Sequence, residues 1–510
     1  MLGKVKSYAL SGVDGFEVDI EVDLNAGLPA YETVGLGDTA VKESKERVRS
    51  AIKNCLFNYP LKKITINLAP ADSKKEGSHF DLAIAIAILA ASEQITCQNY
   101  KDYVFVGELS LDGALRNVNG VMPLIISAMQ KGYKKFIIPS SNGAEASYIT
   151  GTEIYALDKL SDVVDLLNGV KTFSPLEART FKADNTTNRY NVDFSEVKGQ
   201  FVAKRALEIA VAGGHNIMLI GPPGAGKTMM AKCVPTIMPD MTFEESIEVT
   251  KIHSIAGVLD SSIGIVSQRP FRTPHHTVTV PALTGGGAKS KPGEVSLAHN
   301  GVLFLDEMPE YQRHTLETLR QPLEDGVVTV SRAKQSLEYP AKFMLVASMN
   351  PCPCGNLGSK TQQCKCSAGE IHKYISKLSG PLLDRIDLQV EVDGISYDEL
   401  RGKSDEEKSE FIKVRVEKAR EAQRNRYQGS GIFVNARMTN AQVRKFCALD
   451  DRCERLLESA FQRLHLTARA STRILKVART IADLEGSENI SSSHISEAIQ
   501  YRSMDRKYWE

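Results

Sequence analysis

Hydrophobic and polar positions alternate in two different periods over the first 170 residues. Alternation of apolar and polar residues is typical of a half-buried strand, whereas apolar residues three or four positions apart are typical of a helix. Both patterns recur, so residues 1–170 are predicted to form an α/β or α+β domain. The predicted strands cover 15–22, 63–68, 103–106 and 136–139, and the predicted helices cover 39–54, 81–92 and 121–131.

The rest of the chain divides at a polar segment without periodicity. Residues 171–190 fit an interdomain linker. Residues 191–395 alternate strands and helices, as a parallel sheet with crossover helices requires. Residues 396–510 are predicted to be helical, first as charged linker helices and then as a helical lid with segments at 452–464, 472–484 and 493–501.

Composition is that of a soluble globular protein, with 42% hydrophobic and 25% charged residues. The formal net charge of +1 means that a nucleic-acid role needs a local basic surface. The longest apolar run, 82–91, is too short to cross a bilayer, and the N-terminus lacks the features of a signal peptide. A cytoplasmic protein without a membrane partner is therefore expected.

A glycine-rich segment follows the apolar run 217–220 and matches the pattern G-x-x-x-x-G-K-[ST]. In such a phosphate loop the backbone wraps the phosphates of a nucleotide, the lysine reaches the β- and γ-phosphate oxygens, and the Thr hydroxyl holds Mg²⁺. ATP and Mg²⁺ are the expected cofactors. The residues are Gly221, Pro222, Pro223, Gly224, Ala225, Gly226, Lys227 and Thr228.

A second apolar run, 302–305, ends in Asp306 and Glu307. With Thr228, Asp306 is expected to complete the Mg²⁺ shell, and Glu307 to polarise the attacking water. The alternative is a core strand that happens to end in two surface acids. A third apolar run, 342–349, ends in Asn350, whose amide can orient that water.

Two arginines follow these motifs, Arg385 and Arg473. The ordered set of phosphate loop, acid pair, Asn350 and the two arginines resembles an AAA+ ATPase. This resemblance implies a hexamer, with Asn350 as sensor 1, Arg385 acting on the neighbouring subunit's γ-phosphate and Arg473 as sensor 2. The alternative for Arg385 is a salt bridge with Asp384 or Asp387, and Arg473 has a similar structural alternative.

Longer motifs resemble the magnesium-chelatase-like branch of the AAA+ ATPases, and within it the bacterial ComM/YifB-like group. They lie at 271–277, 285–287, 292–307, 348–355 and 379–387, and the resemblance runs along essentially the whole chain. It implies an ATP-driven hexameric helicase that migrates DNA branches during recombination, as in natural transformation. The alternative is an ATP-driven remodeller of protein complexes of the magnesium-chelatase type.

Basic residues fall in two segments that suit DNA contact. Residues 325–339 alternate like a β-hairpin with basic residues at its turn, and residues 269–291 are predicted to form a second loop. In a sixfold ring such loops give a cationic channel. The alternative is that these side chains are only solvated. The DNA-binding candidates are Arg272, Lys289, Lys291, Arg332 and Lys334.

Four of the nine cysteines lie close together as two C-x-C pairs, Cys352 with Cys354 and Cys364 with Cys366. Four thiolates so placed suit a tetrahedral Zn²⁺. The C-x-C spacing is tighter than the usual C-x₂-C. A redox-sensitive pair and unbound thiols are therefore alternatives.

Within the first domain, residues 74–82 and 106–116 resemble the proteolytic domain of Lon-type proteases. The positions of that family's serine and lysine are occupied here by His79 and Met122, and Ser78 is one position away. We expect a Lon-like domain without protease activity, serving as a binding or ring-organising module.

Overall fold

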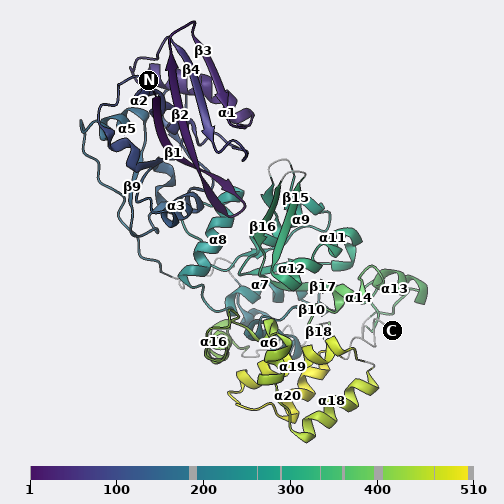
Figure 1. The fold of residues 1–510 in the computed structure, drawn as a ribbon. Coiled ribbons are helices and arrows are strands. Elements are labelled where there is room, and N and C mark those ends of the chain that lie inside the picture. The colour runs from purple at the N-terminus through teal and green to yellow at the C-terminus, as the bar shows by residue number, and fades with distance from the viewer. Residues whose placement is uncertain are drawn as a thin grey trace. The chain divides into compact units, whose positions relative to one another are not determined.

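The computed structural model describes residues 2–182, 192–260, 262–287, 290–332, 335–358, 362–394, 406–464 and 466–502 (Figure 1). The chain forms two compact units. The first contains Met1–Lys182, Thr242–Ser267 and Leu337–Tyr339, and the second contains Ala183–Met241, Gln268–Ser336 and Pro340–Glu510. Residues 242–267 therefore join the first unit, although they lie within the stretch 191–395 that the sequence assigned to the ATPase domain. Most of the predicted linker's second half lies outside the described residues.

The first unit is built on a seven-stranded mixed sheet of order β3-β4-β2-β1-β5-β8-β9. Its central strands β1, β2 and β4 are antiparallel, and β5, β8 and β9 continue in parallel. A small ladder pairs β6 with β7. The strands are β1 (Leu2–Ser11), β2 (Asp14–Asn25), β3 (Ala30–Val34), β4 (Lys63–Ala69), β5 (Tyr103–Phe105), β6 (Glu108–Leu109), β7 (Leu115–Arg116), β8 (Lys135–Pro139) and β9 (Glu153–Leu157).

Helices pack on this sheet, where alternate strand residues are apolar and buried. Val18, Ile20 and Val22 of β2 are fully buried, with polar residues between them. The helices α2 and α3 both pack against β1 and β2, and α8 packs against α3. These helices are α1 (Thr39–Asn54), α2 (Asp81–Ala91), α3 (Val121–Gln130), α4 (Gly143–Ala146), α5 (Leu160–Leu167) and α8 (Phe243–Ala256).

The second unit contains a five-stranded sheet of order β11-β14-β17-β10-β18, parallel throughout. Three of its strands, β10, β14 and β17, are buried along their whole length, as expected of a parallel sheet covered on both faces. The strands are β10 (Ile217–Ile220), β11 (Phe271–Arg272), β14 (Val302–Leu305), β17 (Met344–Met349) and β18 (Leu388–Glu391). Shorter ladders pair β12 (Gly285–Gly286) with β13 (Lys291–Pro292), and β15 (Val327–Arg332) with β16 (Gln335–Pro340).

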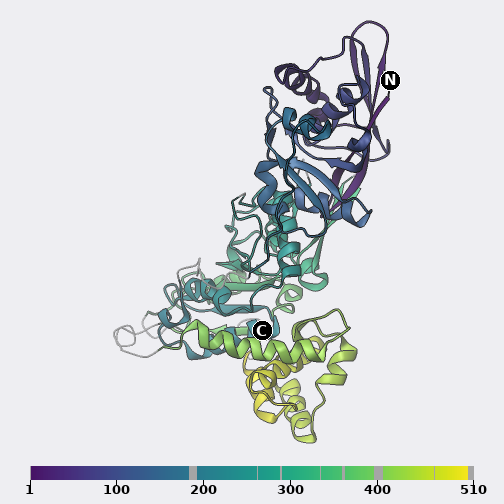
Figure 2. The ribbon, with the colours of Figure 1, turned by 90° about the vertical axis from the view of Figure 1, so that its left-hand side faces the viewer.

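Helices of the second unit pack on the sheet and on one another. The helix α6 lies against β10 and β18, and α7 against β14 and β17. The long helix α16 packs against α6, α7 and α19 (Figure 2). The helices are α6 (Phe201–Gly213), α7 (Lys227–Ile237), α9 (Val280–Thr284), α10 (Glu294–Leu297), α11 (Arg313–Glu317), α12 (Arg320–Asp325), α13 (Ala368–Ile375), α14 (Gly380–Leu383), α16 (Ser409–Arg426), α17 (Asn440–Phe446), α18 (Asp451–Arg463), α19 (Ala468–Leu484) and α20 (Ser492–Gln500).

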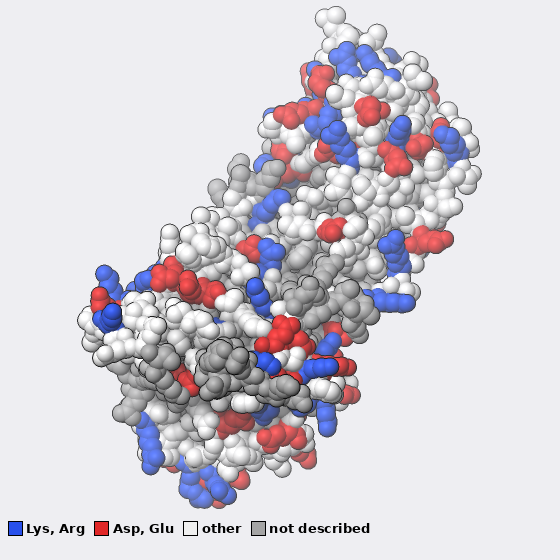
Figure 3. Space-filling view, turned by 180° about the vertical axis from the view of Figure 1, so that it is seen from behind, with Lys and Arg blue, Asp and Glu red and all other residues white. Residues whose placement is uncertain are grey.

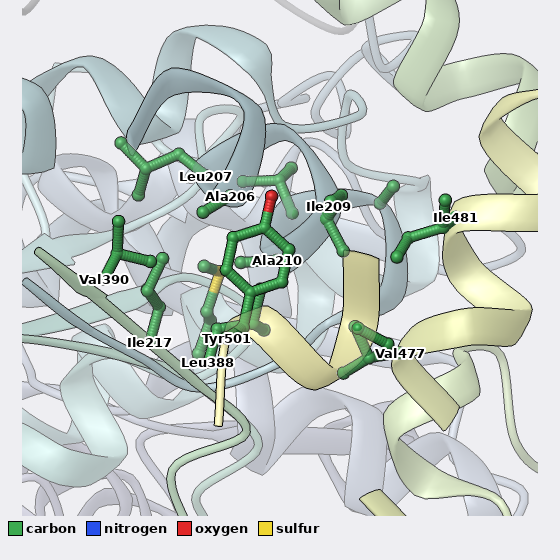
Figure 4. Close-up of a cluster of buried hydrophobic side chains, with 14 of the residues drawn as sticks. Ala206, Leu207, Ile209, Ala210, Ile217, Leu388, Val390, Val477, Ile481 and Tyr501 are labelled. Atoms are coloured by element: carbon green, nitrogen blue, oxygen red, sulfur yellow. The ribbon is translucent and has the colours of Figure 1, made fainter. Parts of the chain in front are cut away.

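One hydrophobic core joins the sheet of the second unit to its C-terminal helices. Figure 4 shows Tyr501, which follows α20, beside Ala206 and Ala210 of α6 and near Leu388 of β18. Val477 and Ile481 of α19 belong to the same buried cluster. Because this apolar surface is shared, the C-terminal helices are anchored to the nucleotide-binding sheet rather than forming a separate core.

Candidate active site

The candidate site lies at one edge of the parallel sheet in the second unit. The glycine-rich segment follows β10, the acid pair follows β14, and Asn350 follows β17, which lies between these two strands. Because β10, β14 and β17 are parallel, their carboxyl ends meet at the same edge. The fold therefore gathers three motifs that are separated by up to 130 residues of sequence.

The backbone of the phosphate loop adopts conformations that need glycine. Gly224 and Gly226 have φ values of 77° and 84°, in the left-handed region. A Cβ atom on Gly221 would lie 2.2 Å from the carbonyl oxygen of Val392. The loop leads into α7, which begins at Lys227, so the free amide groups of the first helical turn are available to an anion.

Lys227 is held by oxygen atoms on both sides. Its Nζ donates to the carbonyl oxygens of Gly221 at 2.6 Å and Pro222 at 2.8 Å, and to Oδ1 of Asn350 at 3.2 Å. Burial lowers the pKa of Lys227 to about 8, and the negative charges of Asp306 and Glu307 act in the opposite direction. Phosphate oxygens of a bound nucleotide would add the negative charge that favours the ammonium form.

Thr228 and Asp306 meet where a magnesium ion is expected. The Thr228 hydroxyl donates to Oδ2 of Asp306 at 2.8 Å. The other carboxylate oxygen of Asp306 accepts a hydrogen bond from the hydroxyl of Ser348, which fixes the orientation of the carboxylate. Hydroxyl and carboxylate oxygens are ligands that Mg²⁺ prefers, so the residues fit the ion. Ser348 was not singled out from the sequence, although a polar residue in the apolar strand 344–349 is a usable signal.

Glu307 has a strained backbone at the end of β14. Its φ is +50°, which is uncommon for a residue with a side chain. Its N–H donates to the Ser348 hydroxyl at 3.2 Å, and the side chain is exposed at the site. Strain of this kind often accompanies a functional position, because the surrounding contacts hold the side chain in a required direction.

The two predicted arginines both form ion pairs within the second unit. Arg385 pairs with Glu324 and donates to the carbonyl oxygen of Pro381 at 2.6 Å. The alternative drawn from the sequence was an ion pair of Arg385 with Asp384 or Asp387. The structure pairs Arg385 with Glu324 instead, so this alternative names the wrong partner. Arg473 on α19 pairs with Asp387.

Asp387 is buried at the opposite end of the strands from the phosphate loop. It precedes β18, and its N–H bonds to the carbonyl oxygen of Asn216, the residue before β10. Burial disfavours its charged form, yet the charge of Arg473 and a hydrogen bond from His215 hold its pKa well below the usual range. Arg473 is therefore anchored at the amino-terminal edge of the sheet, whereas the phosphate loop lies at the carboxyl-terminal edge.

The structure describes the side chains of only two of the five basic candidates for DNA contact, Arg272 and Lys291. Arg272 forms two hydrogen bonds with the carboxylate of Glu294, at 2.6 and 2.8 Å, so its charge is neutralised locally. Lys291 lies exposed in β13. The strands predicted for the hairpin are present as β15 and β16, and Arg332 is the last residue of β15. The side chain of Arg332, and the residues Lys289 and Lys334, lie outside the described part of the chain.

The four clustered cysteines converge in space. The Sγ atoms of Cys352, Cys354, Cys364 and Cys366 all lie within 4.8 Å of one another. The N–H groups of Lys365 and Asn356 hydrogen-bond to the Cys354 sulfur and lower the pKa of this thiol to about 6. All nine cysteines are free thiols in the structure.

In the first unit, His79, which the sequence resemblance aligns with the Lon-family serine, is buried. Its Nε2–H donates to the carbonyl oxygen of Tyr8 at 3.0 Å. Met122 is also buried, and the Ser78 hydroxyl donates to the carboxylate of Glu108. The partners of Ser78 and His79 are a carboxylate and a backbone carbonyl, and the absence of protease activity stays a prediction.

The burial of His79 predicts acid sensitivity of the first unit. Burial lowers the pKa of His79 from 6.5 to about 4. Above pH 6.5 the ring is neutral whether the chain is folded or unfolded, and between pH 6.5 and 4 only the unfolded chain takes up the proton. The free energy of unfolding should fall by about 3 kcal/mol across this window. Hydrogen exchange of β1 amides at about pH 7 and about pH 4.5 measures the loss.

A matched pair of variants isolates this effect. His79→Phe should remove the loss of stability between the two pH values, whereas His372→Gln, at an exposed position, should keep it. An unchanged pH dependence in His79→Phe would show that another group titrates.

A phosphate loop, a hydrogen-bonded Thr–Asp pair and a polar Asn on neighbouring parallel strands define a P-loop ATPase of the AAA+ class. Residues 193–400 match the family described as magnesium chelatase, subunit ChlI. Residues 20–142 and 406–502 match two further families, described as subunit ChlI of Mg-chelatase and as magnesium chelatase, subunit ChlI C-terminal. These matches confirm the predicted fold class: an AAA+ core, an N-terminal Lon-protease-like α/β domain and a C-terminal helical lid.

Full-length relatives define the group more closely. The competence protein ComM of Haemophilus influenzae is 45% identical over 508 residues, covering 99% of this chain and 98% of the relative. The uncharacterized protein YifB of Escherichia coli is 44% identical over 510 residues, with the same coverage. The magnesium-chelatase subunit ChlI of Guillardia theta is 27% identical and covers only 46% of this chain and 67% of its own length. The chain belongs to the ComM/YifB family of magnesium-chelatase-like ATPases.

Across the part of the chain that the structure describes, each helix is too short or too polar to traverse a lipid bilayer. On the face shown in Figure 3, Lys and Arg side chains are interspersed with Asp and Glu side chains. This mixture agrees with the net charge of +1 over the full chain.

Proposed function

We propose that this chain is the subunit of a hexameric, ATP-driven motor that migrates DNA branches during recombination, as in natural transformation. ATP and Mg²⁺ are its cofactors, DNA junctions are its substrate, and it works in the cytoplasm. The observation that carries the proposal is the match to a competence protein over 99% of the chain, with a complete nucleotide site inside it. A chelatase or remodelling role has less support, because the chelatase subunit matches only 46% of the chain.

Hydrolysis is assigned to the residues at the sheet edge. The phosphate-loop amides and Lys227 bind the phosphates, and Thr228 and Asp306 would hold Mg²⁺, which neutralises charge on the transferred phosphoryl group. Glu307 accepts the proton of the attacking water as its bond to phosphorus forms. Asn350, which is within 3.2 Å of Lys227 Nζ, orients that water.

Both arginines are assigned to a neighbouring subunit's nucleotide. Arg385 lines an open cavity of about 510 Å³ together with Glu317, Arg320 and Glu324. In the separate chain its guanidinium is held by Glu324, so action on a neighbouring γ-phosphate requires this ion pair to open. Arg473 is held at the edge of the sheet opposite its own phosphate loop. These positions suit action in trans, which requires a ring.

DNA contact is assigned to the two loops identified from the sequence. Lys291 is exposed, and with Lys289, Arg332 and Lys334 it would line the channel of the ring. Arg272 is assigned a weaker contribution, because Glu294 already neutralises its charge.

A branch-migration assay tests the proposal directly. Purified protein should displace a labelled strand from a synthetic three-way or four-way junction with ATP. Lys227→Ala should lower the rate on the order of 10²-fold or more, because the β/γ-phosphate contact is lost. Lys232→Ala, at an exposed position of the same helix α7, is the matched control and should remain active.

The same assay distinguishes the alternative function. Hydrolysis of ATP that DNA does not stimulate, without movement of any branched or partial duplex, would contradict the DNA motor. Stimulation by a protein substrate instead would favour the remodeller of protein complexes.

A further inference from the structure

The four cysteine sulfurs lie close enough to one another to share a single metal ion. Cys352 Sγ lies 3.4 Å from Cys354 Sγ and 3.7 Å from Cys364 Sγ, and the last two are 3.6 Å apart. A zinc–sulfur bond of about 2.3 Å gives a tetrahedron with edges of about 3.8 Å. A disulfide would need sulfurs about 2.05 Å apart, so the four groups are arranged as ligands rather than as two oxidised pairs.

Backbone groups around the sulfurs reinforce this arrangement. The N–H groups of Lys365 and Asn356 hydrogen-bond to the Cys354 sulfur, as backbone N–H groups do around metal-bound thiolates. Cys352 is fully buried, which anchors one ligand in the protein. Cysteines alone, without carboxylates, favour Zn²⁺ over Mg²⁺ or Ca²⁺.

The loop that carries the cysteines touches the phosphate loop. A Cβ atom on Gly355 would lie only 2.5 Å from Cδ of Pro223, so the Gly355 backbone packs directly on the phosphate loop. Gly355 itself is fixed to the first ligand, because its N–H donates to the carbonyl oxygen of Cys352 at 2.9 Å.

The residues on either side of the cysteine-containing segment also contact each other at the nucleotide site. Asn350, two residues before Cys352, contacts Lys227 through its side chain. The N–H of Asn350 hydrogen-bonds to the hydroxyl of Tyr374 in α13, which follows the last cysteine. Fixing the four sulfurs would therefore fix Gly355 against Pro223 and Asn350 beside Lys227 together.

We propose that Cys352, Cys354, Cys364 and Cys366 bind one Zn²⁺ as four thiolates, and that the metal holds residues 352–355 against the phosphate loop. Nucleotide affinity then depends on a metal that takes no part in hydrolysis. This coupling between metal binding and nucleotide affinity rests on the proposed nucleotide site. The metal site itself rests only on the geometry of the four sulfurs.

Metal content tests the first half of the proposal. Full-length protein from zinc-supplemented cells should contain about one Zn²⁺ per chain by elemental analysis. Exchange with Co²⁺ should give sulfur-to-cobalt charge transfer and the strong visible bands of tetrahedral coordination. The double variant Cys364→Ser/Cys366→Ser, at two half-buried positions, should lose both signals, and Cys97→Ser, at an exposed cysteine of the first unit, should keep them. Wild-type protein without tightly bound zinc or cobalt bands, or a double variant that retains them, would overturn the metal site.

A pair of glycine variants tests the coupling. Gly355 and Gly358 have φ values of 79° and 77°, so Ala strains the backbone similarly at both. Only at Gly355 does the added Cβ meet Pro223, because no described residue lies within 4 Å of a Cβ on Gly358. Titration with a fluorescent ATP analogue should show about tenfold weaker binding for Gly355→Ala than for Gly358→Ala, with zinc content unchanged in both.

The double cysteine variant completes the comparison. It should also bind the analogue more weakly than Cys97→Ser, while its helical content by circular dichroism stays close to that of the wild type. Equal affinities within either pair would refute the coupling and leave the zinc measurement to stand by itself. Failure of the wild type to bind the analogue would instead contradict the nucleotide site.

Discussion

Glu307→Gln will lower the rate of ATP hydrolysis by about 10²- to 10⁴-fold, while ATP affinity stays near the wild-type value. The amide has nearly the same shape as the carboxylate, but it cannot accept the proton of the attacking water. Lys227, Thr228 and Asp306, which bind the phosphates and Mg²⁺, are untouched by the change. The loss should therefore fall on kcat rather than on binding.

Single-turnover hydrolysis and analogue binding, measured on the same preparation, separate these two effects. Glu310→Gln is the matched control: Glu310 lies three residues further on, at the surface, where it pairs with Lys377 at 3.4 Å. This variant should hydrolyse ATP normally. A comparable loss of hydrolysis in both variants, or a loss of ATP affinity in Glu307→Gln, would contradict the prediction. Either result would show that the acids stabilise the local structure rather than activate the attacking water.

The nucleotide site could be predicted from the sequence because each part combines a local motif with a buried strand. The phosphate loop, Asp306 and Asn350 each directly follow an apolar run, which is enough to place all three at one sheet edge. The structure adds the contacts that orient them, such as the Ser348 hydroxyl on Asp306. In the first unit, all four predicted strands and all three predicted helices are present, within three residues at each boundary.

Pairings between distant residues could not be predicted in the same way. Arg272 looked available to DNA because its partner Glu294 lies 22 residues away and becomes adjacent only when β11 and α10 pack. The alternative considered for Arg385 was an ion pair with a sequence neighbour, Asp384 or Asp387, and the structure gives Glu324 from α12. Similarly, α8 packs on α3 of the first unit, although it follows α7 directly in the chain. Local patterns place motifs at strand ends, but they do not identify which side chains from distant elements pair with each other.

Arg385→Ala will lower ATP hydrolysis about 10³-fold or more in the assembled protein, because the γ-phosphate of a neighbour loses its positive partner in the transition state. Binding of ATP should change little, since the phosphate loop of the same subunit is intact. Arg444→Ala, an exposed arginine of α17 in the same unit, should have no comparable effect. Steady-state hydrolysis at a protein concentration that supports assembly measures the change.

Mixing two inactive variants then decides whether Arg385 acts within its own subunit or on its neighbour. Lys227→Ala subunits retain the arginine, and Arg385→Ala subunits retain the phosphate loop. In randomly mixed rings, roughly a quarter of the interfaces pair an intact phosphate loop with an intact arginine from the next subunit, so hydrolysis should return to roughly that fraction. Action within one subunit would leave the mixture as inactive as its components, because no chain then carries both residues. Recovery would also require that Glu324 release Arg385 when subunits meet, since this ion pair holds the guanidinium in the separate chain.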